Sequence, residues 1–81
     1  MSLIKYKRQV LAILFENLNQ SQPQLVPSTS IAEQMGVNLP ELQQVLRGME
    51  GTGIIETDPD QQYNLITREG VRWLNKQRHV V

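Results

Sequence analysis

Apolar residues recur at intervals of three or four positions in two consecutive segments, residues 28–35 and 39–52. Gly36 ends the first segment. The pattern predicts two short helices joined by a tight turn, the second with a polar face directed outward. The inward positions are Ile31, Ala32 and Met35 in the first helix and Leu42, Val45, Leu46 and Met49 in the second.

The residues at the start of each segment support these boundaries. Ser28 and Thr29 carry hydroxyl groups that can cap the first-turn amides of the first helix. Asn38 is the predicted N-cap of the second helix, with Glu41 as its reciprocal partner in a capping box. Pro40 falls in the first turn, where a missing N–H costs little. Each helix therefore has its own start signal.

The remaining segments complete one predicted domain over residues 1–81, because a chain of this length buries only about 60% of its unfolded surface and needs a simple core. A broad apolar stripe in the first helix implies burial on more than one side. The predicted elements are a helix over 3–19, a very short strand at 25–26, a hairpin over 54–66 with Pro59 in its turn, and a last helix over 67–78 capped by Thr67. The predicted core is Leu11, Leu14, Ile31, Leu42, Leu46, Ile55, Leu65 and Trp73.

Three stretches in this order resemble the winged helix-turn-helix of DNA-binding transcriptional regulators. They are Ser-Ile-Ala-Glu-Gln-Met-Gly-Val-Asn at 30–38, Leu-Arg-Gly-Met-Glu-Gly-Thr-Gly-Ile-Ile at 46–55 and Ile-Thr-Arg-Glu-Gly at 66–70. The resemblance implies a mainly α fold with a small β-hairpin wing, built as a three-helix core plus a C-terminal helix. It places the helix-turn-helix at about 28–53 and the wing at about 54–66.

The hairpin departs from the family pattern. Tyr63 stands three residues before Ile66, where the family usually has its aromatic residue two before the equivalent position, so a bulge or a register shift is expected. Asp58 and Asp60 at the predicted tip would repel phosphates. Wing contacts to DNA are therefore not carried over from the family.

The distribution of charge bears on a DNA-binding function, because phosphate neutralisation supplies most non-specific affinity for DNA. Eight basic residues balance eight acidic ones, so the formal net charge is zero. Residues 1–8 carry three positive charges, and residues 63–81 carry four against Glu69. Residues 9–62 hold Arg47 as their only cation against seven acids. Basic ends thus flank an acidic middle that contains the predicted recognition helix.

Catalytic chemistry finds little support in the residue types present. The chain has no cysteine and a single histidine, His79, and the glycines of residues 48–53 lack the lysine and the strand-to-helix context of a phosphate loop. We expect no enzymatic activity, no cofactor and no small-molecule substrate. No apolar run reaches the length of a membrane span, so a cytoplasmic protein is expected.

The resemblance implies that residues 39–52 enter the major groove of double-stranded DNA. Gln43 and Gln44 are chemically suited to adenine, and Arg47 to guanine or a phosphate, although all three also suit a solvated helix face. Ser28 and Thr29 can donate to phosphates or serve only as caps. The predicted DNA-binding set is Ser28, Thr29, Asn38, Gln43, Gln44 and Arg47.

Two further readings concern partners. Winged helices also serve as protein-interaction adaptors, which suits the acidic third helix and wing. A homodimer through the first and last helices is predicted as well, because Tyr6, Val10, Trp73 and residues 80–81 offer apolar area beyond one small core. Gly48 and Gly51 form a row without bulk on the third helix, either for close approach of a partner or as tolerated surface glycines.

Overall fold

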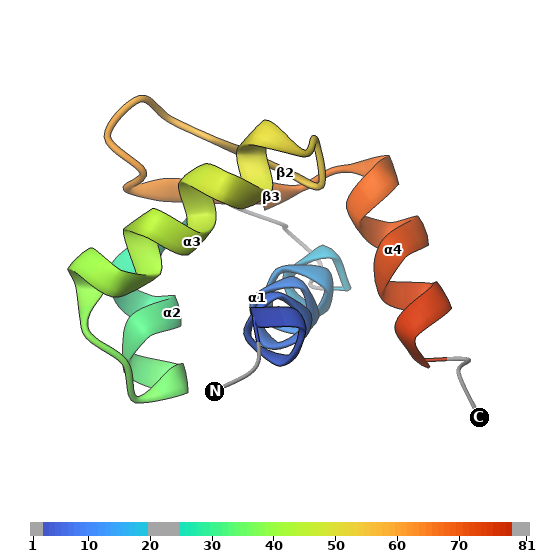
Figure 1. Ribbon diagram of the computed structural model, residues 1–81, viewed down its shortest axis with the longest axis horizontal. Coiled ribbons are helices and arrows are strands. Elements are labelled where there is room, and N and C mark those ends of the chain that lie inside the picture. The colour runs from blue at the N-terminus through green and yellow to red at the C-terminus, as the bar shows by residue number, and fades with distance from the viewer. Residues whose placement is uncertain (1–2, 20–24, 79–81) are drawn as a thin grey trace.

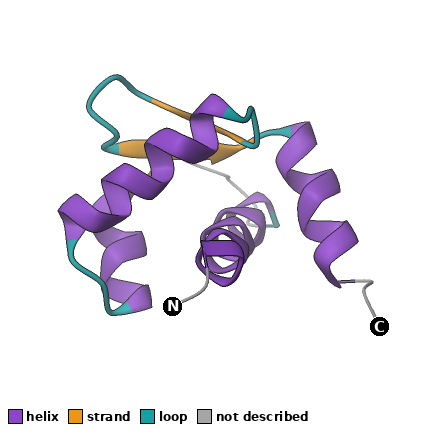
Figure 2. Ribbon diagram, in the orientation of Figure 1, coloured by secondary structure: helices purple, strands orange, loops and turns teal. Residues whose placement is uncertain are grey.

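Four helices and a small sheet make up the protein (Figures 1 and 2), in a computed structural model that describes residues 3–19 and 25–78. The predicted fold class is confirmed: helices form most of the described chain, and three short strands form one antiparallel sheet. In chain order the elements are α1 (Leu3–Leu18), β1 (Val26–Pro27), α2 (Ser28–Met35), α3 (Leu39–Gly51), β2 (Ile55–Thr57), β3 (Tyr63–Ile66) and α4 (Arg68–Arg78).

The turn between α2 and α3 forms as its residues predict. Gly36 takes a left-handed φ of 68° at the end of α2, a conformation that costs glycine little. The Asn38 side-chain oxygen accepts a hydrogen bond from the Glu41 amide at 2.9 Å, which caps α3. Gly53 follows α3 with a φ of 80° and lets the chain reverse into β2.

The start of α2 differs from the prediction. Pro27 is its N-cap residue, and no side chain caps the first turn. The physical reason is that β1 runs directly into α2, so that Ser28 already has helical geometry and its amide donates to the Gln62 carbonyl at 2.8 Å. Ser28 and Thr29 are therefore first-turn residues rather than caps.

The sheet has the strand order β1-β3-β2, with β3 in the middle. Ile55 pairs with Ile66 and Thr57 with Asn64 in an uninterrupted register, so the expected bulge is absent from the described pairs. The extra residue is taken up in the turn, where Gln61 has a left-handed φ of 53°. The Gln61 amide donates to the Asp58 carbonyl at 2.9 Å, which confirms the predicted turn around Pro59.

Most of the predicted core is confirmed, because Leu11, Leu14, Ile31, Leu42, Leu46 and Ile55 are all buried. Two positions differ. Leu65 is half-exposed because its strand neighbour Asn64 faces inward, and strand residues alternate between faces. In α4 it is Leu74 that is fully buried, and Trp73 only packs against the edge of the core.

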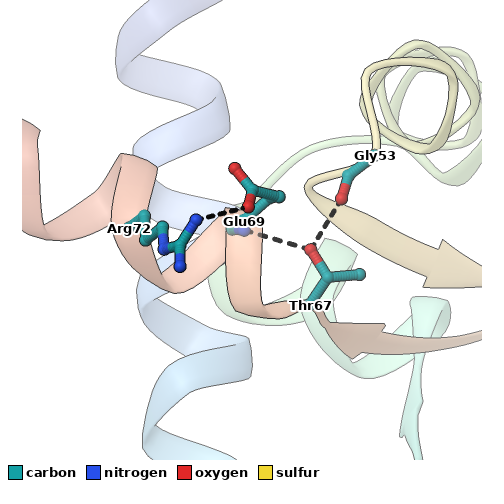
Figure 3. A network of polar contacts seen from close by, with 5 residues as sticks. Gly53, Thr67, Glu69 and Arg72 are labelled. Carbon is teal, nitrogen blue, oxygen red and sulfur yellow. Dashed lines mark hydrogen bonds and ion pairs between the residues drawn. The ribbon is translucent and has the colours of Figure 1, made fainter.

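Thr67 fixes the start of α4 against the end of α3 (Figure 3). Its hydroxyl donates to the Gly53 carbonyl at 2.6 Å and accepts from the Gly70 amide at 3.0 Å, as a capping residue does. A Cβ at Gly70 would lie 2.1 Å from the Ile54 carbonyl oxygen, so only glycine fits there. The predicted cap is confirmed, and it seats α4 beside α1, which it contacts.

The apolar surface expected for a homodimer is largely used within the monomer. Tyr6 is 4% exposed and Val10 is fully buried, while Trp73 is half-buried; residues 80–81 lie outside the described chain. Burial raises the pKa of the Tyr6 phenol, and the Glu41 carboxylate adds to the effect. The assignment of Tyr6 and Val10 to a dimer surface was therefore wrong, because α1 is enclosed by other elements of its own chain. The dimer itself stays a prediction.

Candidate nucleic-acid interface

The candidate interface is the outer face of α3, together with the wing loop between β2 and β3. Helix α3 buries Leu42, Leu46 and Met49, so the opposite side of the helix faces solvent. Figure 1 shows α3 crossing in front of the sheet, with the wing loop rising beside it. The exposed residues of this outward side include Gln44, Arg47, Gly48 and Gly51.

Gly48 and Gly51 have open space around them. A Cβ at either position would meet nothing within 4 Å. Since no packing within the protein requires glycine there, the two residues leave a shallow, accessible strip on α3. This geometry is compatible with both interpretations of the row, close approach of a partner and tolerated surface glycines.

Arg47 is held against the wing. Its Nη2 donates to Oε1 of Gln61 at 3.0 Å, and Nε2 of Gln61 donates to the Pro59 carbonyl at 3.0 Å. Gln61 is almost completely buried. Nothing in the spacing of the sequence points to Gln61; its role arises from the left-handed turn, which directs its side chain back toward α3.

Gln43 makes a second contact of the same kind, because its Nε2 donates to the Asp60 carbonyl at 3.3 Å. Two of the three predicted base-reading side chains therefore contact the wing loop. Gln44 is exposed, and its side chain has no hydrogen bond within the described chain. The side-chain oxygen and NH₂ group of Gln44 are therefore both available to a partner, whereas Arg47 keeps only some of its five N–H donors free.

The hydroxyl of Ser28 is occupied by contacts inside the protein. It is buried, its hydroxyl donates to the Gln61 carbonyl, and it accepts from Nδ2 of Asn64 at 2.8 Å. These bonds join the start of α2 to the wing, so the predicted phosphate contact by Ser28 was wrong. Its neighbour Thr29 is exposed in the first turn of α2, where no side chain caps the amides.

Asn38 lies on the surface at the start of α3 and is used as a cap. Its side-chain oxygen is therefore occupied, although its amide N–H groups point to no partner within the described residues. A hydrogen bond to a phosphate from this amide is compatible with the cap.

A shallow cavity of about 300 Å³ lies where α2, α3 and β3 meet. Gln43, Tyr63 and the exposed Thr29 all line it. Tyr63 was not among the DNA-binding residues predicted from the sequence. The cavity makes the start of α2, the side of α3 and the base of the wing one continuous surface. Its lining residues are Pro27, Ser28, Thr29, Leu39, Gln43, Gln62 and Tyr63.

The charge on this surface is mostly negative. Glu41 and Glu50 are exposed on α3, Asp60 is exposed on the wing, and Arg47 is the cation among them. Hydrogen bonds from the Tyr63 and Gln62 amides lower the pKa of the Asp58 carboxyl, so this group stays negatively charged at neutral pH. Exposed cations lie instead on α1 and α4, namely Lys5, Arg8, Arg68, Arg72 and Lys76.

Two other kinds of site are absent from the described residues. No three acidic, histidine or cysteine side chains gather there in a way that could hold a metal ion. Within the same residues, no helix has the length and apolar character needed to cross a bilayer.

Comparison with known proteins supports the fold. No protein-family model matches the chain, and no curated protein matches it significantly. A crystal structure of a MarR-family transcriptional regulator from Rhodococcus sp. RHA1 is similar over 90% of this chain, with a TM-score of 0.73 and 24% sequence identity. The match covers 51% of that protein, so this chain spans about half of its length. The likeness shows a winged-helix fold.

Proposed function

We propose that this chain binds double-stranded DNA as part of a transcriptional regulator, with α3 in the major groove. The observation that carries the proposal is the exposed outer strip of α3, set between the wing loop and the open first turn of α2. A helix held across a fixed turn can enter a major groove about 12 Å wide and present side chains to base edges. The fold shared with a solved regulator supports the same assignment.

The residues have different roles in this proposal. Gln44 reads a base edge, because its amide is free to donate and accept as adenine requires. Arg47 contacts a guanine or a phosphate with the donors that its bond to Gln61 leaves free. Thr29 and the uncapped amides around it bind a backbone phosphate at the start of α2.

Gln43 and Gln61 act indirectly. Their contacts with the wing loop and with Arg47 set the angle between the wing and α3. Reading paired half-sites about 34 Å apart would require two copies of the chain, and dimerisation stays a prediction of this proposal.

Selection from random duplexes tests the proposal. The purified protein is incubated with a random-sequence duplex pool at about 50 mM salt, and retained DNA is sequenced over several rounds. We expect an enriched motif and a shallow salt dependence, equivalent to two to five phosphates neutralised, because few cations lie near α3. Retention no greater than that of a protein-free control would contradict DNA binding.

Variants of Arg47 then identify its contact. Arg47→Ala should weaken binding more than any other single change in α3, and loss of a bidentate base contact costs about 1 to 3 kcal/mol of discrimination. Arg47→Lys keeps the charge but loses the planar fork, so it should retain a phosphate contact and lose a base contact. Glu33→Ala, an exposed change on α2, is the matched control and should leave the enriched motif unchanged.

A second candidate function is a protein-interaction adaptor, favoured by the excess of exposed acids over Arg47 on α3 and the wing. Like charges repel the phosphate backbone at short range. In that case the same face binds a basic protein surface. Absence of any retained duplex at low salt, with a folded protein by circular dichroism, would favour this alternative.

A further inference from the structure

Two exposed apolar patches on this protein carry opposite charges. Leu3 and Ile4, 57% and 54% exposed, lie at the start of α1; Leu25, 53% exposed, directly precedes β1, and Tyr63, 47% exposed, begins β3. Of the described large apolar residues that are exposed, only Leu18 falls outside these two pairs. Contiguous exposed apolar surface rimmed by polar residues marks interaction sites, whereas singly scattered apolar residues are normal on a protein surface.

The patch that contains Leu25 and Tyr63, here called the outer sheet groove, is a hollow of about 210 Å³. Glu56 and Leu65 are directly paired across β2 and β3, and they face away from the buried Ile55 and Asn64. No described element other than the sheet and its adjoining turn lines the groove. Its lining residues are Leu25, Glu56, Thr57, Asp58, Tyr63 and Leu65.

The groove is acidic. Glu56 is exposed in its floor, and the Asp58 carboxylate at its end accepts hydrogen bonds from the Gln62 and Tyr63 amides. Its lining holds no lysine or arginine. The groove therefore suits a segment that combines apolar side chains with positive charge.

The patch at the start of α1, here called the α1 tip, combines apolar side chains with positive charge. Leu3 and Ile4 stand beside the exposed cations Lys5 and Arg8 on the first turns of α1. The α1 tip carries no acidic residue: the first turn of the helix contains none. Its apolar side chains and its charge thus complement those of the outer sheet groove.

One molecule cannot join its own two patches. Helix α1 contacts β3 from the inner side of the sheet, where the core lies (Figure 1), whereas Glu56 and Leu65 of the groove face away from the core. We propose that the α1 tip of one copy docks in the outer sheet groove of a second copy. The contact joins two different surfaces, so it is heterologous and leaves one patch free at each end of a pair. Association then continues with concentration unless a ring closes.

This proposal does not rest on the proposed DNA contacts of Gln44 and Arg47, since neither patch contains them, but Tyr63 lines both the groove and the cavity beside α3. The proposed contact between two copies does not involve Tyr6 or Val10, which are buried inside each monomer.

Sedimentation velocity over about 20 to 500 µM protein tests the contact, a range suited to weak association. The weight-average mass should rise above the monomer value of 9.3 kDa at about 50 mM salt, and less so at about 500 mM salt, which screens exposed charges. Glu56→Lys in the groove, or Lys5→Glu with Arg8→Glu in the tip, should each weaken association about fivefold or more. All three positions are exposed, so the variants should fold.

Mixing the two charge-reversed proteins gives the decisive result. Alone, Glu56→Lys sets a cation opposite the basic tip, and the double variant sets acids opposite the acidic groove. In the mixture the basic tip of the first protein meets the unchanged acidic groove of the second, and the acidic tip of the second meets the new cation of the first, so association should return. Glu33→Lys on α2 and the double variant Arg68→Glu with Lys76→Glu on α4 are matched controls with the same charge changes outside both patches. A wild-type protein that stays monomeric throughout, variants that associate like the wild type, or a mixture that fails to associate would each overturn the proposal.

Discussion

The guanidinium of Arg47 on α3 donates a hydrogen bond to the side-chain oxygen of Gln61 in the wing loop, at 3.0 Å. Gln61 is buried, although it lies in a turn and has a left-handed φ of 53° that is rare outside glycine. Its amide nitrogen is bonded in turn to the Pro59 carbonyl. The Gln61 side chain thereby joins the wing loop to α3, beside the second contact that Gln43 makes with the Asp60 carbonyl.

Two substitutions at Gln61 separate the value of this contact from the strain of the turn. Gln61→Ala removes the side-chain hydrogen bonds and keeps the left-handed backbone, so it should lower the free energy of unfolding by about 1 kcal/mol or more. Gln61→Gly loses the same bonds but relieves the backbone, and it should be more stable than the alanine variant by up to about 1 kcal/mol. Urea denaturation of the two variants measures the difference. A glycine variant less stable than the alanine variant would show that the turn changes its conformation.

The packing of α3 can be tested with a pair of leucines. Leu46 is fully buried, so Leu46→Ala should cost about 2 to 5 kcal/mol because it leaves a cavity in a small core. Leu65, half-exposed on the outer face of the sheet, is the matched control, and Leu65→Ala should cost about 1 kcal/mol or less. Chemical denaturation gives both values. A loss below about 1 kcal/mol for Leu46→Ala would mean that α3 is packed differently.

Local residue chemistry was sufficient to predict most of the fold. Gly36, Asn38 and Thr67 each determine a chain reversal or a helix start through their own backbone or side-chain preferences, and each takes its predicted place. Apolar spacing predicted the core in the same way. The sequence failed where the outcome depends on the sheet: the inward position of β3 is taken by Asn64, and no periodicity in a four-residue strand distinguishes it from Leu65.

The candidate site was less predictable, because its contacts join residues that are distant in sequence. Ser28 is separated by 33 positions from Gln61, and the Gln61 carbonyl accepts a hydrogen bond from the Ser28 hydroxyl. A hydroxyl at the start of a helix looks the same in sequence whether it faces solvent or a neighbouring loop. The exposure of Gln44 could be predicted from helix periodicity alone, whereas the engagement of Arg47 and Gln43 required the position of the wing.

Asp58 should make the wing sensitive to acid. The Tyr63 and Gln62 amides lower the pKa of its carboxyl below the ordinary value of 3.8, so the folded state favours the charged form. The stability that this carboxylate contributes is therefore present above pH 3.8 and is lost as the pH falls through the lower folded-state pKa. Asp58→Asn keeps an acceptor without a titrating group, so this part of the acid dependence should disappear. NMR titration of the Tyr63 amide follows the transition, and a midpoint above 3.8 would contradict the assignment.

Thr57 and Asn64 are paired directly across β2 and β3, and each holds a buried side-chain oxygen without a hydrogen-bond partner among the described residues. A buried hydroxyl that makes no hydrogen bond has lost its contact with water and gained nothing in return. Thr57→Val replaces that hydroxyl by a methyl group of nearly the same shape, in a strand position where valine is favoured. The variant should therefore be as stable as the wild type or more stable by up to about 1 kcal/mol.

Thr57→Ser is the control for this change, because it keeps the hydroxyl and removes the methyl group, and it should be destabilising. Thermal and urea unfolding of the three proteins provide the comparison. If Thr57→Val instead costs more than about 1 kcal/mol, the hydroxyl is bonded in solution, and the carbonyl oxygen of the Asn64 side chain is the acceptor that the strand register places opposite it. In that event Asn64→Val should cost less in the Thr57→Val background than alone, because the two oxygens form one interaction.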